Sequence, residues 1–254
     1  MADHVRITKS DGILQLVLDR ADKKNALTDA MYGALADAFA AAESDREVRV
    51  ILIAGEGDMY TAGNDVSDFA SAGASDAPRN VDRFLRAIAG CSLPLVAAVQ
   101  GRAVGVGTTM LLHCDYVLLA EGTILTTPFV NLALVPEAAS SLLLPLRIGH
   151  ARAFAAFALG EPIAAADAHA WGIANRVVEP AALRPAALEV ASRLARQPRA
   201  SVTATKALMK RTLAVVDQMD CEGREFAARL ASPEAKEAFA AFAERRAPDF
   251  SKFD

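Results

Sequence analysis

The chain has 254 residues, of which 53% are hydrophobic and 23% charged, and a formal net charge of −4. This length is enough for one substantial core with a small appended region, and the composition is ordinary for a globular protein. The basic residues are dispersed, whereas nucleic-acid-binding proteins usually carry a basic patch or stripe, so we expect no nucleic-acid partner. No apolar stretch is long enough to cross a bilayer, so we expect no membrane partner.

The three cysteines, Cys91, Cys114 and Cys221, are odd in number and far apart in the chain. They form neither a zinc-binding pattern nor a disulfide framework. Isolated thiols are typical of a reducing compartment, so we expect a cytoplasmic protein. No cluster of His, Asp and Glu has the spacing of metal ligands, and we predict no metal site.

In chain order, the first predicted element is a β-hairpin over residues 5–19, because two β-type runs flank the turn sequence at 10–12. The hydroxyl of Thr28 can cap a helix that runs through an alanine-rich stretch to about Glu43.

Three later apolar runs predict strands buried on both faces, at 49–55, 93–101 and 115–122. Helical patterns lie between them, at 79–89 and, more loosely, at 105–113. Strands that alternate with helices predict an α/β fold with a buried parallel sheet.

The pattern becomes helical after about residue 180, with no strong strand. Residues 234–246 carry an apolar stripe of alanine and phenylalanine at helical spacing, which must be buried against the core or another subunit. We therefore predict an α/β core over residues 1–195 and a helical region over residues 196–254.

Two glycine-containing loops follow predicted strands, at 60–66 and 101–109. Such loops can present backbone N–H groups to an anion or to a developing oxyanion. In the first, the alternative is a simple turn with Asp65 near a helix cap. In the second, Gly105 and Gly107 fit close ligand approach or only tight packing, and Met110 stands where a dinucleotide fingerprint needs a third glycine.

A third candidate segment spans residues 134–141. Pro136 can begin a helix, which would place Glu137 in the first turn, where the helix dipole favours a carboxylate. The neighbouring side chains are apolar, and a carboxyl group in an apolar wall has a raised pKa that suits proton transfer near neutral pH. The residues alone leave both interpretations open.

Together these segments resemble the crotonase (enoyl-CoA hydratase/isomerase) superfamily over nearly the whole chain. Five stretches carry the resemblance: RADKKNAL (20–27), YTAGNDV (60–66), LPLVAAVQGRAVGVG (93–107), IAAADAHAWGIANRVV (163–178) and FAERRAPDF (242–250). Ala21 stands where proline is usual. The resemblance implies a ClpP/crotonase-type spiral of ββα units that binds acyl-CoA, with a C-terminal helical trimerisation region.

The resemblance also implies the partners and the site. The protein would be a homotrimer or a dimer of trimers that acts in fatty acid metabolism on an acyl-CoA thioester, with no cofactor beyond the coenzyme A carried on the substrate. The backbone N–H groups of Ala62 and Val106 would hold the thioester oxygen. The substrate-binding residues would be Lys23, Lys24, Ala26, Ala62, Gly63, Asn64, Asp65, Val66, Gly105, Val106, Phe129 and Lys252.

Two positions depart from the hydratases, which carry a pair of glutamates where this chain has Thr109 and Phe129. The motifs G-N-D, T-P-F and P-E-x-x-S-S instead resemble Δ3,Δ2-enoyl-CoA isomerases of the peroxisomal type. That likeness implies Glu137 as the single base that converts 3-enoyl-CoA to 2-enoyl-CoA through a dienolate. The alternatives are an unconventional hydratase, a lyase, another crotonase-type reaction, or a catalytically silent acyl-CoA-binding module.

Overall fold

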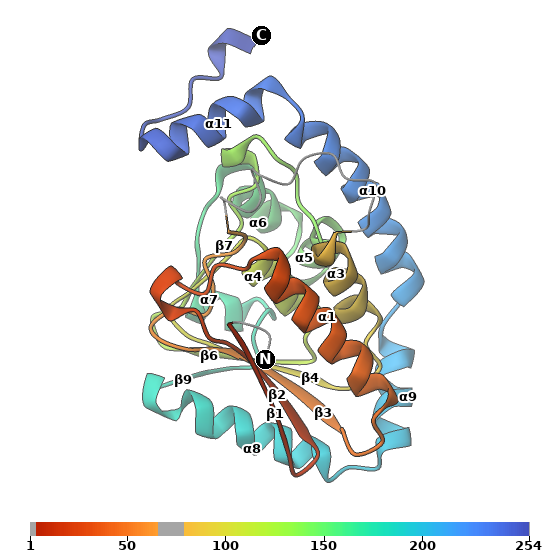
Figure 1. Cartoon of the computed structure of the whole chain (residues 1–254). Helices are drawn as coiled ribbons and strands as arrows, with labels where there is room; N and C mark the ends of the chain where they lie inside the picture. The colour runs from red at the N-terminus through yellow and green to blue at the C-terminus, as the bar shows by residue number, and fades with distance from the viewer. Residues whose placement is uncertain (1–3, 66–78, 254) are drawn as a thin grey trace.

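The computed structural model describes residues 4–65 and 79–253, which form two sheets surrounded by helices (Figure 1). The larger sheet has the strand order β1-β2-β3-β4-β6-β9. Its strands are β1 Val5–Ser10, β2 Ile13–Leu18, β3 Val50–Gly55, β4 Leu95–Val99, β6 Tyr116–Ala120 and β9 Arg176–Val178. The β1–β2 hairpin is antiparallel and every other neighbouring pair is parallel, as the sequence predicts.

A second sheet contains three short strands that the sequence analysis did not identify, in the order β5-β7-β8. They are β5 Arg102–Val104, β7 Ile124–Thr126 and β8 Ile163–Ala164. Strand β5 follows β4 and strand β7 follows β6, so the chain passes from the large sheet to the small one twice in the same way. This repetition produces the spiral of similar units.

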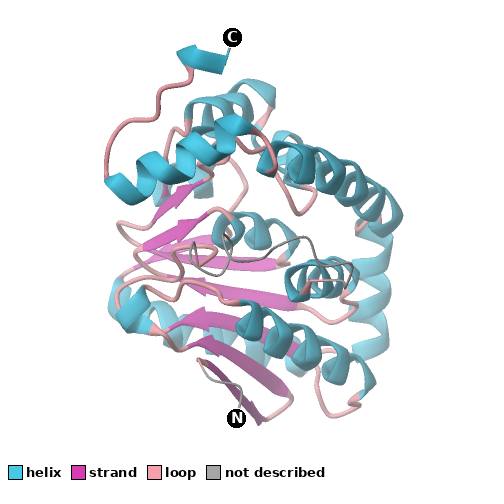
Figure 2. Ribbon diagram, turned by 45° about the horizontal axis from the view of Figure 1, so that its top comes forward, coloured by secondary structure: helices cyan, strands magenta, loops and turns pink. Residues whose placement is uncertain are grey.

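Apolar side chains on both faces explain the continuous apolar runs of the central strands. In β3, Ile51 and Ile53 pack into the core formed with α1 and α3. The alternate residues Val50 and Leu52 pack against α8 on the opposite face, because successive side chains of a strand point in opposite directions. Figure 2 shows the strands enclosed between these helical layers.

The helices account for most of the remaining chain. They are α1 Asp29–Ser44, α3 Asn80–Gly90, α4 Val106–Thr109, α5 Ser140–Ile148, α6 His150–Phe154, α7 Ala165–Ala170, α8 Leu183–Ala195, α9 Arg199–Met209, α10 Thr212–Leu230 and α11 Pro233–Glu244, with a π-helical turn at Ala155–Leu159 and 3-10 turns at Ala21–Lys23, Met110–His113, Val130–Leu132, Pro180–Ala182 and Ser251–Phe253. The predicted cap of α1 is confirmed, because the Thr28 side chain accepts a hydrogen bond from Met31 N.

The predicted helix start at Pro136 is wrong. Helix α5 begins at Ser140, because Ala138 and Ala139 adopt left-handed backbone conformations with φ of 58° and 55°. Glu137 therefore lies in a loop, and the interpretation of Glu137 as a first-turn carboxylate falls away. Pro145 lies inside α5 and does not end it.

Past residue 195, the described residues contain helices and no strand, so the helical character of the C-terminal region is confirmed. In Figure 1, α11 lies at the opposite end of the molecule from α8. The division of the chain at residue 195 stays a prediction. Within residues 4–65 and 79–253, no helix has both the length and the hydropathy needed to cross a bilayer.

An ion pair between the buried Lys206 and the partly exposed Asp115 ties α9 to the core. Lys206 Nζ donates to the carbonyl of Leu93 at 2.7 Å and to Asp115 Oδ2 at 2.7 Å. Asp115 Oδ2 also accepts a hydrogen bond from Leu95 N at 2.8 Å, so the pair holds the start of β4.

Replacing this lysine should destabilise the fold. Lys206→Met keeps the buried hydrocarbon but leaves the Leu93 carbonyl without its donor and Asp115 without its ion partner, which should lower the free energy of unfolding by about 2 kcal/mol in urea titrations. Lys9→Met, which breaks ion pairs at the surface, is the matched control and should cost less than about 1 kcal/mol. Equal losses in the two variants would contradict a structural role for the Lys206–Asp115 pair.

Candidate active site

A cavity of about 350 Å³ collects most of the predicted site residues. Its walls come from the loops after β3, β5 and β7 and from the C-terminal region. The lining residues are Ala62, Gly63, Asn64, Val104, Gly105, Val106, Pro128, Phe129, Asn131, Leu132, Leu134, Glu137, Phe226, Ala238, Phe239, Phe242, Arg246 and Pro248. Among these described residues Glu137 is the one carboxylate, in a wall that is otherwise largely apolar.

A larger cavity of about 1170 Å³ lies beside α9 and α10. Its charged residues include Asp115 and Lys206, which neutralise each other. The smaller cavity combines a carboxyl group with glycine loops, so we take it as the candidate site.

The environment of Glu137 suits proton transfer. Burial raises the pKa of its carboxyl to about 7; a hydrogen bond from Thr109 opposes this shift and the charge of Glu222 adds to it. Thr109 Oγ1 donates to Glu137 Oε1 at 2.5 Å, which orients the carboxyl. A group with this pKa can both accept and return a proton at neutral pH.

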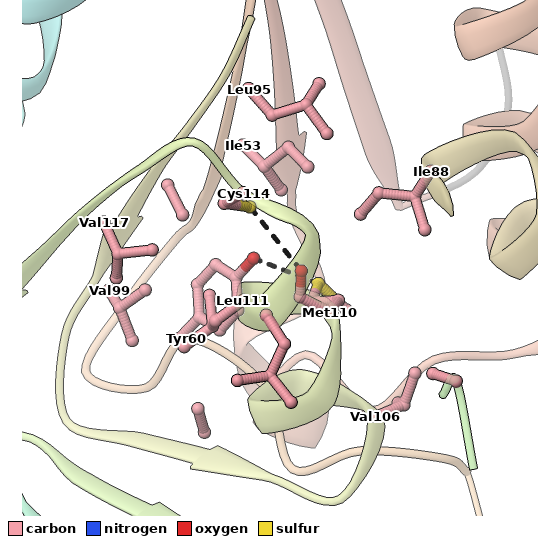
Figure 3. Close-up of a cluster of buried hydrophobic side chains, with 14 of the residues drawn as sticks. Ile53, Tyr60, Ile88, Leu95, Val99, Val106, Met110, Leu111, Cys114 and Val117 are labelled. Atoms are coloured by element: carbon pink, nitrogen blue, oxygen red, sulfur yellow. Dashed lines mark hydrogen bonds between the residues drawn. The ribbon is translucent and has the colours of Figure 1, made fainter. Parts of the chain in front are cut away.

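The second glycine loop presents a free donor at the cavity. Gly105 has φ of 54° and ψ of −117°, a conformation that side chains disfavour. Val106 then begins α4, and its N–H has no acceptor within the described residues, as expected at the first position of a helix. The Val106 side chain lies in the buried cluster with Met110 and Leu111 (Figure 3), which anchors the loop.

The first glycine loop packs directly on the second. Gly63 has φ of 87°, and a Cβ there would lie 2.7 Å from the carbonyl oxygen of Val104. Thr61 Oγ1 accepts from Gly63 N at 3.0 Å and donates to the carbonyl of Asn25 at 2.7 Å. These contacts hold the two loops at one end of the cavity.

The structure corrects the donor predicted in this loop. The Ala62 N–H already donates to the carbonyl of Lys24 at 2.9 Å. Gly63 N and Asp65 N are also bonded, to Thr61 Oγ1 and to the carbonyl of Leu27. Within residues 62–65, Asn64 is left with an N–H that has no acceptor among the described residues, so Asn64 replaces Ala62 as the candidate partner of Val106.

Asn64 is also held through its side chain. The Tyr32 hydroxyl of α1 donates to Asn64 Oδ1. Burial raises the pKa of Tyr32 well above its ordinary value, and the charge of Glu137 contributes, so the phenol stays a donor.

Several predicted binding residues lie outside the cavity lining. Lys23 and Lys24 are exposed on the surface. Arg20 donates a hydrogen bond to the carbonyl of Ala26 and forms an ion pair with Asp65, at 2.6 Å. Lys252 donates a hydrogen bond to Glu237 at 2.8 Å. Lys24 pairs with Asp58. Val66 lies outside the described residues. The structure therefore brings together the glycine loops, Phe129 and Glu137, and leaves the lysines apart.

Sequence reasoning missed the residues that close the cavity from the C-terminal region. Phe226 comes from α10, Phe239 and Phe242 from α11, and Arg246 from the segment that follows. The apolar stripe over 234–246 was the available signal, since it showed that this helix must cover something.

Comparison with known proteins agrees with this fold. A family model described as enoyl-CoA hydratase/isomerase matches residues 8–252. A crystal structure of an enoyl-CoA hydratase/isomerase from Pseudoalteromonas atlantica is 41% identical with a TM-score of 0.95, covering 98% of this chain and 100% of that one. The fold is thus the crotonase fold, and the class is that of acyl-CoA enzymes. The chain belongs to the enoyl-CoA hydratase/isomerase family.

Two curated relatives have more specific names. The 1,2-epoxyphenylacetyl-CoA isomerase of Escherichia coli is 32% identical over 251 residues, covering 94% of this chain and 95% of that protein. Enoyl-CoA delta isomerase 2 of Homo sapiens is 33% identical over 178 residues, covering 67% of this chain and 45% of that protein.

The raised pKa of Glu137 should be visible in the stability of the protein. The folded state keeps a proton that the unfolded state loses above pH 4.5, so stability should fall as pH rises towards 7 and then level off. The full shift corresponds to roughly 3 kcal/mol at most.

Glu137→Gln should therefore gain stability relative to the wild type as pH rises, in urea titrations between pH 5 and 8. Glu225→Gln removes an exposed carboxyl from α10 and is the matched control, which should follow the wild type. A constant difference between Glu137→Gln and the wild type would show that the carboxyl ionises normally.

Proposed function

We propose that this enzyme isomerises 3-enoyl-CoA to 2-enoyl-CoA with Glu137 as its single base. The observation that carries the proposal is one carboxyl group, with a pKa of about 7, in an apolar cavity that Asn64 and Val106 also line. The backbone N–H groups of these two residues have no acceptor among the described residues. An allylic proton shift needs one such base and a site for the negative charge.

The reaction would run in two proton transfers. The Glu137 carboxylate removes a proton from C2, and the electron pair moves into the thioester to give a dienolate. The N–H groups of Asn64 and Val106 would hold the oxygen that becomes negative, a contribution of ~3 kcal/mol per donor in comparable sites. The Glu137 carboxyl then returns its proton to C4, which leaves the double bond between C2 and C3.

The residues around Glu137 favour isomerisation over water addition. Thr109 and Phe129 occupy the positions where hydratases carry their glutamates, and neither can share acid and base roles with Glu137. Phe129 is 7% exposed and packs on Phe157, with ring centroids 6.2 Å apart. A wall of this kind keeps water away from the dienolate.

The acyl group would occupy the apolar part of the cavity, against Leu132, Leu134, Phe226, Phe239 and Phe242. Aromatic lining also suits a cyclic acyl group. The name of the relative from Escherichia coli makes 1,2-epoxyphenylacetyl-CoA a second candidate substrate. The substrate screen should therefore contain this compound, 3-enoyl-CoA and 2-enoyl-CoA of several chain lengths, the last to detect hydration.

Glu137→Gln tests the mechanism most simply, because glutamine keeps the shape but cannot act as a base. Its kcat for 3-enoyl-CoA should fall about 10²- to 10⁴-fold. Binding of the product, 2-enoyl-CoA, measured by calorimetry, should be unchanged because the backbone donors to its thioester oxygen remain. Glu225→Gln should keep wild-type kinetics, and a fully active Glu137→Gln enzyme would refute the assignment.

We also propose that the chain assembles as a homotrimer. Four large apolar side chains are between 74% and 88% exposed in one chain: Leu146, Leu208, Met209 and Leu213. Three come from α9 and α10, and burying them against another copy would remove this apolar surface from water.

Light scattering should give a mass three times the 26.8 kDa of one chain, or a multiple of that value. Met209→Glu should weaken the assembly, while Glu225→Gln should leave it intact. A monodisperse wild-type monomer would contradict the proposal.

A further inference from the structure

One peptide unit beside Glu137 is held at both ends. The carbonyl of Ala138 accepts a hydrogen bond from His113 Nε2 at 2.8 Å, and the N–H of Ala139 donates to Glu222 Oε2 at 2.5 Å. Both alanines have left-handed backbones, which residues with a side chain rarely adopt. The conformation that presents Glu137 to the cavity therefore depends on side chains outside the loop.

His113 supplies the first of these contacts as a neutral donor. Its ring is buried, and burial lowers its pKa to about 3. Among the described residues its Nδ1 has no hydrogen-bond partner, so the proton sits on Nε2 and faces the Ala138 carbonyl.

Glu222 supplies the second contact from α10, far along the chain. Its carboxylate also accepts hydrogen bonds from Ser141 N, at 2.9 Å, and from the Ser141 hydroxyl. Gln218 of α10 donates to the same hydroxyl at 2.9 Å. Helix α5 has no side-chain cap of its own, so Glu222 satisfies its first N–H groups as an N-cap residue would.

The charge of Glu222 acts on the same group that its hydrogen bonds position. Burial raises the pKa of Glu222, while the donors on Ser141 and Ala139 stabilise its ionised form. The other ionisable groups around the loop are Tyr32 of α1, which Glu137 influences, the neutral His113, and Arg246, which lines the cavity.

We propose that Glu222 is a positioning residue for Glu137, acting through the Ala138–Ala139 peptide and the start of α5. This inference rests on the proposed role of Glu137 as the base. The position of Glu137 would then depend on the packing of α10 against the loop. The C-terminal helical region would contribute to catalysis through Glu222, although Glu222 itself does not contact the substrate.

The test compares two variants of α10. Glu222→Gln keeps the size of the side chain but loses charge and an acceptor oxygen. Asp220→Asn is the matched control, because Asp220 joins α10 to Arg86 of α3 at 2.5 Å on the protein surface, away from the loop. Each variant is assayed for isomerisation of 3-enoyl-CoA across pH 5 to 9.

Glu222→Gln should lower kcat by about 10- to 100-fold, as expected when a catalytic group is misplaced, with KM changed less than about twofold. The midpoint of its pH profile should move to lower pH, because a negative charge near Glu137 has been removed. Asp220→Asn should keep the wild-type kcat and midpoint. If the two variants behave alike, the inference is overturned.

Two further variants separate the possible failures. Ser141→Ala removes one hydroxyl donor and should lower kcat without changing KM, so it tests the contact if Glu222→Gln does not fold; wild-type kcat would then overturn the inference. Glu137→Gln is assayed beside them. Loss of activity in Glu137→Gln with no effect of Glu222→Gln refutes the inference alone, whereas an active Glu137→Gln enzyme refutes the proposed function and the inference together.

Discussion

The desolvation of one carboxyl group, that of Glu137, is the constraint on which the site depends. Burial among apolar side chains disfavours the ionised form of a carboxyl group, and this raises the pKa of Glu137 to about 7. The protein stabilises this arrangement with one direct hydrogen bond, from Thr109, and with the contacts of His113 and Glu222 to the adjacent peptide. Without these hydrogen bonds, the carboxyl group would turn towards solvent and ionise with its ordinary pKa.

The spiral of sheets supplies the other half of the site. The glycine loops that follow β3 and β5 lie at one end of the cavity, where Gly63 packs against Val104. Hydrogen bonds within the first loop and to residues 24–27 use its other N–H groups, and the N–H of Asn64 has no acceptor among the described residues. Because both donors are backbone groups, they are rigid before any substrate binds, which is the property an oxyanion site needs.

Several features of this structure could be predicted from the sequence because the signal was local. The hairpin over residues 5–19, the Thr28 cap and strands β3, β4 and β6 of the large sheet follow from short patterns of apolar and turn residues. Glu137 stood out because a carboxylate among apolar neighbours is unusual.

Other features depend on contacts between distant segments and carry no local signal. Ala138 and Ala139 have the highest helix propensity of any residue type, yet His113 and Glu222 hold them in the left-handed region, so the start of α5 was misplaced. The prediction that the Ala62 N–H is the free donor was wrong for a similar reason. That N–H donates to the carbonyl of Lys24, a contact that the local sequence does not reveal.

The fate of a deuterium at C2 of 3-enoyl-CoA tests the single-base account most directly. If Glu137 removes the label and returns it before the carboxyl exchanges with solvent, a fraction of the 2-enoyl-CoA product should carry deuterium at C4, as seen by mass spectrometry or NMR. The Glu137→Gln enzyme should form no such product. A product in which the hydrogen added at C4 comes entirely from solvent would contradict the account. So would a 3-hydroxyacyl-CoA product formed by addition of water at C3.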